Sequence, residues 1–265
     1  MLKKLFIAIV AMALVVPAQA QLKGLGKSLG KAAKTATKAV GDVAGDMATD
    51  MAANSVSDKI VEFMDTNNNV VETDSDYYKR LESLVAANYT SVDGLSLNYK
   101  VYQSDEANIL SLANGNIRVY TGMMDLLSDD ELLAVIANQI GHIANKDVRD
   151  ALLKVASEDN ASNATGKQLE KMLSLSGDKL GSIINELIQI PYTETQNKAA
   201  DSYAYDLLKK NGAETDALVS MLKKFAELET VDVDSDDASA EALAVAKYIG
   251  VNAGNSARAS LVASK

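Results

Sequence analysis

Apolar residues recur at helical spacing along most of the chain, and shorter strand-like runs replace that spacing between residues 95 and 120. The strand-like runs lie at 95–102, 107–112 and 117–120, and residues 113–116 predict a turn before the last of them. The pattern therefore predicts a helix-rich α+β fold, in which one small antiparallel β-sheet packs on a helical core. The predicted helices are at 47–64, 77–87, 146–158, 165–189 and 214–228, with an alanine-rich helix before a loose C-terminal tail.

Two capping boxes mark further helix starts. Ser128 and Glu131 stand three residues apart before an apolar run, and Thr193 and Gln196 repeat the arrangement. The second of these helices is expected to run to Lys210, where Asn-Gly follows.

Residues 1–20 resemble a secretory leader. Lys3 and Lys4 precede an apolar run at 5–16 that is too short to span a bilayer, and Ala-Gln-Ala at 18–20 fits a cleavage site. A membrane anchor is the alternative. We expect a mature protein from about Gln21 that is periplasmic or secreted. The chain has no cysteine, which excludes a lipoprotein anchor and disulfides.

Residues 21–45 carry lysines at helical spacing beside an apolar stripe, which is compatible with weak contact to an anionic membrane surface. Glycines weaken that helix, and a basic linker or a helix packed on its own domain is the alternative. The net charge of −10 argues against a nucleic-acid partner. We therefore predict a leader at 1–20, a basic helical segment at 21–70 and one domain at 71–265.

Residues 138–143 read Asn-Gln-Ile-Gly-His-Ile within the helix that follows Ser128. In the H-E-x-x-H motif, two histidines on one helix face bind zinc and the glutamate acts as general base. Asn138 stands at the position of the first histidine, Gln139 at that of the glutamate, and His142 is the single histidine of the chain. The spacing of a zinc-protease helix is present without most of its reactive groups.

The stretches 97–102, 116–125 and 131–142 resemble the HtpX-like, CAAX-prenyl-protease-like zinc metallopeptidases, especially secreted single-domain members of bacterial envelopes. Residues 196–208 are similar to that family's E-x-E-A-D segment, and 252–258 to its H-P-x-S-x-x-R ending. The resemblance implies a zincin-like helical core. It also implies that Asn197 replaces the third zinc ligand, and that Asp201 lies where a carboxylate orients a ligating imidazole.

These replacements predict a degenerate site with no bound metal and no catalytic residue. Amide oxygens are weak ligands for Zn²⁺, and Gln139 cannot accept a proton at ordinary pH. An active zinc endopeptidase with unusual ligands is the alternative, in which Glu131 or Asp201 would supply an acid ligand.

The four polar residues Asn138, His142, Asn197 and Asp201 are expected to be buried, where polar groups need hydrogen-bond partners. We hypothesise a metal-free network between two helices, in which Asn138 donates to Asp201. The alternative is that His142 lies among unrelated amides.

The predicted strand at 117–120 invites a second hypothesis. In the resembling family an edge strand near the zinc helix pairs with extended substrate, and such pairing needs no metal. The expected peptide-binding edge consists of Ile117, Arg118, Val119 and Tyr120, unless this strand only completes the sheet. The expected function is binding or quality control of extended or unfolded envelope polypeptides. An active metalloendopeptidase and a membrane-surface structural protein remain as alternatives.

Overall fold

The computed structural model describes residues 22–157, 166–235 and 238–265, so the predicted leader lies outside the described residues. The chain forms two compact units, one up to Asp46 and one from Met47 to Lys265. The described part of the first unit is helical and belongs to α2 (Leu22–Asn67), which ends in the polar run at 66–69. None of the helices in the described ranges is long and apolar enough to cross a membrane.

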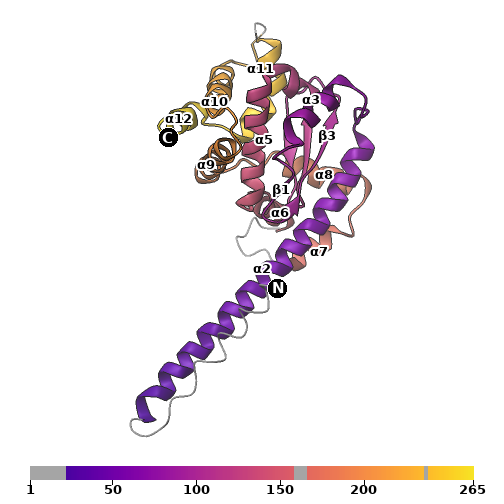
Figure 1. The fold of residues 1–265 in the computed structure, drawn as a ribbon. Helices are drawn as coiled ribbons and strands as arrows, with labels where there is room; N and C mark the ends of the chain where they lie inside the picture. The colour runs from indigo at the N-terminus through magenta and orange to yellow at the C-terminus, as the bar shows by residue number, and fades with distance from the viewer. Residues whose placement is uncertain (1–21, 158–165, 236–237) are drawn as a thin grey trace. The chain divides into compact units, whose positions relative to one another are not determined.

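The second unit has the helix-rich α+β fold that the pattern predicted (Figure 1). Other helices of the unit pack around α5, whose capping box at Ser128 and Glu131 is present as predicted. The capping box of Thr193 and Gln196 likewise opens α9. The bounds are α3 (Asp76–Val85), α4 (Thr121–Leu126), α5 (Asp129–Ala144), α6 (Asp147–Ala156), α7 (Gly166–Met172), α8 (Gly177–Leu187), α9 (Glu194–Lys210), α10 (Asp216–Glu229), α11 (Ala240–Val251) and α12 (Asn255–Val262).

Two small sheets accompany these helices. A hairpin joins β1 (Ser91–Val92) to β2 (Leu95–Ser96), and its turn residues Asp93 and Gly94 both have positive φ, as a tight two-residue hairpin requires. The main sheet has the order β3-β5-β4, formed by β3 (Asn98–Tyr102), β5 (Asn116–Tyr120) and β4 (Ile109–Ser111).

The pairing within the main sheet differs from the prediction in one respect. β4 and β5 are antiparallel, whereas β3 and β5 are parallel, so the sheet is mixed. After β3 the chain first forms β4, and the turn at 112–115 then leads into β5. β5 lies between β3 and β4 and is therefore the central strand. Sequence alternation shows which residues form strands, but not which neighbour each strand takes.

Two helical predictions were also incomplete. The predicted helix at 165–189 is divided into α7 and α8 by residues 173–176, and the predicted loose tail contains α12. Arg258 and Ala259 of α12 are buried, because this helix packs against α10 and α9.

The core of the second unit surrounds α5, in which every residue from Glu131 to Ile143 is buried. α9 and α10 cover it on one side and β4 on another. A second apolar cluster lies where α2 meets α6, α7 and α8, and includes Ile60 and Leu152.

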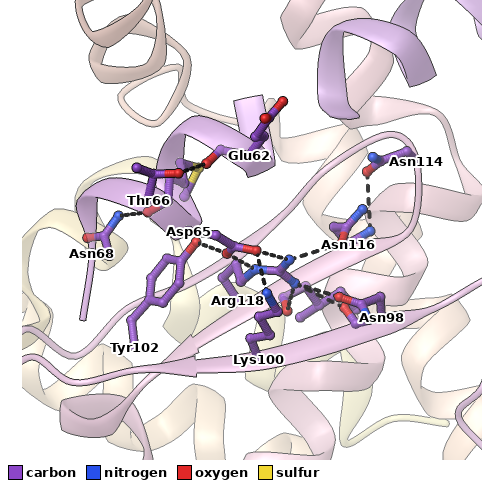
Figure 2. A network of polar contacts seen from close by, with 12 residues as sticks. Glu62, Asp65, Thr66, Asn68, Asn98, Lys100, Tyr102, Asn114, Asn116 and Arg118 are labelled. Carbon is purple, nitrogen blue, oxygen red and sulfur yellow. Dashed lines mark hydrogen bonds and ion pairs between the residues drawn. The ribbon is translucent and has the colours of Figure 1, made fainter. Parts of the chain in front are cut away.

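A polar network joins α2 to the main sheet (Figure 2). Asp65 of α2 accepts two hydrogen bonds from the buried Arg118 guanidinium, at 2.8 and 3.0 Å. Lys100 and Tyr102 of β3 also donate to Asp65. The side chain of Arg118 is therefore fixed by this network rather than directed toward a ligand.

Candidate functional site

The positions indicated by the motif come together where α5 crosses α9. Asn138 and His142 lie one turn apart on α5, as Asn197 and Asp201 do on α9, and all four are buried. The two backbones approach closely at Gly141, where a Cβ atom would lie only 2.7 Å from the Ala200 carbonyl oxygen. A glycine at this place lets the two polar faces meet.

Asp201 is the centre of the polar contacts between these helices. Asn138 Nδ2 donates to Asp201 Oδ1 at 2.8 Å, which confirms the hydrogen bond expected between them. Arg258 of α12 binds both carboxylate oxygens, with Nε and Nη2 each at 2.8 Å. Arg258 Nη1 reaches the Asn252 carbonyl oxygen and Asn255 Oδ1. Asp201 therefore accepts three hydrogen bonds from two side chains, and both of its carboxylate oxygens are engaged.

His142 has partners other than the expected ones. Its Nδ1 lies 2.8 Å from Asp147 Oδ2, at the start of α6, and its ring stacks on Tyr192 with centroids 3.9 Å apart. Burial lowers the pKa of His142, although Asp147 opposes the shift. A neutral imidazole whose Nδ1–H donates to Asp147 leaves Nε2 as a bare acceptor. The predicted four-residue network is thus correct for Asn138 and Asp201 and wrong for His142.

Gln139 faces the sheet. Ser111 of β4 donates to Gln139 Oε1 at 2.9 Å, so the side chain at the base position is fixed by the strand beside it. This contact places the motif helix directly behind β4.

Several buried acceptors at this crossing have no hydrogen-bond partner among the described residues. They are His142 Nε2, Asn138 Oδ1, Asn197 Oδ1 and Asn252 Oδ1. Each belongs to a position that the resemblance assigned to a zinc ligand or to the histidine of the H-P ending. Among the described residues, the Asn197 side chain therefore forms no hydrogen bond with His142 or Asp201, contrary to the hypothesis.

Zinc, which the resemblance implies, does not fit this set of groups. His142 Nε2 is one suitable donor atom, whereas the amide oxygens of Asn138 and Asn197 are neutral. Asp201 is occupied by Arg258 and Asn138, and Glu131 lies at the other end of α5, bound by Lys224 and Ser220. Both acids that the alternative required are thus engaged by other side chains.

The predicted peptide-binding edge is wrong. Residues Ile117, Arg118, Val119 and Tyr120 belong to β5, which is paired on both sides, with β3 and with β4. The strand that borders Gln139 and ends the sheet is β4.

The hydrogen-bond pattern shows which groups of β4 face outward. Tyr120 N donates to Asn108 O and Leu112 N donates to Asn116 O, so the alternate residue Leu110 pairs with Arg118. Ile109 and Ser111 consequently direct their main-chain groups away from β5. Asn108 Oδ1 accepts from Ile109 N, which leaves Ile109 O and the amide group of Ser111 along the edge.

Sequence reasoning missed four residues of this site: Asp147, Tyr192, Ser111 and the role of Arg258. Arg258 carried a signal, because it ends the block similar to H-P-x-S-x-x-R. Asp147, Tyr192 and Ser111 carried none, since each meets α5 only through the tertiary fold.

Comparison with known proteins shows which family the chain is similar to. The model of Peptidase family M48 matches residues 78–246, more than half of the chain. Metalloprotease LoiP of Escherichia coli (strain K12) is 34% identical over 176 residues, which are 66% of this chain and 69% of that protein. Metalloprotease YcaL of the same strain is 34% identical over 170 residues, which are 63% of this chain and 65% of that protein.

Proposed function

This chain belongs to peptidase family M48, and we propose that it binds extended polypeptide without hydrolysing it, as an exported, non-catalytic member. M48 metalloproteases normally use zinc. Asn138 and Asn197 stand at two ligand positions of this chain, and Gln139 stands at the base position. The observation that carries the proposal is that Arg258 and Asn138 both bind the Asp201 carboxylate, which is therefore engaged within the protein rather than free to bind a metal ion.

Loss of hydrolysis follows from the same residues. Gln139 cannot take a proton from water, and removal of an essential catalytic group commonly lowers a rate by about three to six orders of magnitude. The site keeps its scaffold because amides replace the lost groups with polar side chains of similar shape.

The β4 edge supports the binding half of the proposal. Ile109 O and the amide group of Ser111 face away from the sheet, and an extended chain that pairs with them would continue it. The predicted leader would direct the protein to the cell envelope, where unfolded polypeptides expose strand-forming segments. We propose binding or quality control of such polypeptides. Contact of residues 21–45 with a membrane stays a prediction.

The first test measures zinc content and casein hydrolysis of protein purified without chelator. We expect far less than one zinc per chain and no hydrolysis above a buffer control. The positive control is the variant Asn138→His, Gln139→Glu, Asn197→Glu, which restores the family's ligands and base and is expected to bind zinc. Stoichiometric zinc with casein cleavage by the unaltered chain would overturn the proposal.

The second test addresses the β4 edge. Ser111→Pro removes the outward N–H without removing a bond to β5, and is expected to weaken binding of a fluorescein-labelled Thr–Val peptide by about tenfold. Ser111→Ala keeps the N–H and removes only the hydroxyl, which donates to Gln139 Oε1 and contacts Tyr192, so it serves as the matched control. Equal affinity in the two variants, with unchanged circular dichroism, would contradict pairing at this edge.

A further inference from the structure

The residues between α8 and α9 cover the free edge of β4. Ile188, Ile190 and Tyr192 line a cavity of about 50 Å³ together with Leu110, Ser111 and Gln139. The segment 188–192 therefore lies where a polypeptide paired with β4 would have to pass. This placement rests on the fold alone, whereas a role for the segment in peptide recognition also rests on the proposed function.

The segment is attached to this edge through side chains. Its backbone hydrogen bonds are local: Ile188 N donates to Ile184 O, Gln189 N to Glu186 O and Ile190 N to Leu187 O. Within the described residues, no backbone hydrogen bond joins segment 188–192 to β4. The outward groups of Ser111 and Ile109 are thus covered without being paired, and a strand that replaced the segment would gain those bonds.

Tyr192 makes the most specific contact of this segment. Its ring lies 3.9 Å from the His142 ring, centroid to centroid, with only 11° between the planes. Asp147 holds His142 in place through Nδ1, so the imidazole presents a fixed flat face. The surface that receives the Tyr192 ring is therefore built independently of Tyr192.

The stack of Tyr192 on His142 lies where the chain can move. Tyr192 is partly exposed, unlike His142 beneath it, and Pro191 before it is exposed. The residues from Ile190 to Tyr192 lie outside regular secondary structure, between the end of α8 and Thr193, which caps α9. A movement of these few residues would uncover His142 while leaving both helices intact.

We propose that the face of His142 is a subsite for an aromatic side chain of a bound extended polypeptide, and that Tyr192 fills this subsite from within the chain. A client strand pairs with Ile109 and Ser111 and places its own tyrosine or phenylalanine on His142. Tyr192 then leaves together with segment 188–192. Clients with an aromatic residue at this register are preferred, because an aliphatic side chain does not replace the ring stack.

The chain has no tryptophan, so Tyr192→Trp provides a single fluorescent reporter at the subsite. The probe is a short lysine-flanked Thr–Val peptide with one central tyrosine, and the comparison peptide has alanine there. We expect the tyrosine peptide to shift the emission of the introduced tryptophan to longer wavelength as its ring leaves His142. Tyr78→Trp, on α3, is the control reporter and should not respond.

Affinity gives the second measurement, made by fluorescence anisotropy with fluorescein-labelled peptides. Tyr192→Ala is expected to bind the tyrosine peptide about tenfold more tightly than the unaltered chain, because a competing stack is removed. The same variant should favour the tyrosine over the alanine peptide by a similar factor. Tyr192→Phe keeps the stack and loses only the contact of the Tyr192 hydroxyl with the Ser111 side chain, so its affinity should stay close to that of the unaltered chain.

The outcomes separate the two proposals. If both peptides bind with equal affinity to the unaltered chain and to Tyr192→Ala, and the emission of Tyr192→Trp stays constant, the subsite is refuted while peptide binding stands. If neither peptide binds to any variant, including a folded Tyr192→Ala, the proposed function itself is overturned.

Discussion

Arg258 and Asp201 form an ion pair with side-chain exposures of 3% and 1%, so solvent stabilises neither charge. A buried pair of this kind adds little compared with apolar packing, but the loss of one partner leaves a bare charge. Asp201 therefore depends on Arg258, with Asn138 as the other side chain that donates to the carboxylate among the described residues.

Arg258→Ala is expected to lower the free energy of unfolding by about 3–5 kcal/mol, because the Asp201 carboxylate stays buried without its counter-charge. Urea denaturation followed by circular dichroism measures the change. The double variant Asp201→Leu, Arg258→Leu removes both charges and should lose less than Arg258→Ala alone. A loss under about 1 kcal/mol for Arg258→Ala would show that the pair is not buried as described.

The crossing of α5 and α9 depends on Gly141, since any side chain there would meet the Ala200 backbone. Gly141→Ala is expected to destabilise the protein by about 1–3 kcal/mol, because neither helix backbone can yield. The matched control is Gly250→Ala in α11, where a Cβ would meet nothing within 4 Å. That substitution should stabilise by up to about 1 kcal/mol through helix propensity.

Both variants can be compared by thermal unfolding. If Gly141→Ala and Gly250→Ala changed the midpoint in the same direction, the close approach of the two helices would be disproved.

The elements that local chemistry controls were predictable. The capping boxes at Ser128 and Thr193 need only residues three apart, and both are present. The order of the strands was not predictable in this way. β5 is central because it pairs with β3, although β4 lies between these two strands in the sequence. The Asn138–Asp201 bond was accessible only because the resemblance aligned two distant helices, whereas nothing similar indicated Tyr192 or Asp147.

The network around Asp65, at the junction of α2 and the sheet, predicts that the domain loses stability in acid. Burial alone would raise the pKa of Asp65, but hydrogen bonds from Arg118, Lys100 and Tyr102 outweigh it and lower the pKa to about 2 from 3.8. A carboxyl group with a depressed folded-state pKa contributes stability above its unfolded-state pKa. That contribution is lost as the pH falls through 3.8 toward about 2.

We expect the unfolding free energy of the unaltered chain to exceed that of Asp65→Asn by about 1–2 kcal/mol at pH 6. The difference is this small because solvent screens part of the interaction. It should vanish near pH 2. Urea titrations at several pH values measure it. The difference between the two proteins is needed because the pKa of Glu131 is also lowered to about 2, so it titrates in the same window. A difference that does not change with pH would rule out the Asp65 contribution.

Asp147 still holds the remaining imidazole with its free nitrogen turned away from the carboxylate, although no partner among the described residues uses that nitrogen. The hydrogen bond to Asp147 favours the tautomer in which Nε2 is free to accept a proton or a metal ion. Substitutions that place ligands at Asn138 and Asn197, in nature or in the laboratory, would therefore start from an imidazole that is already oriented for coordination.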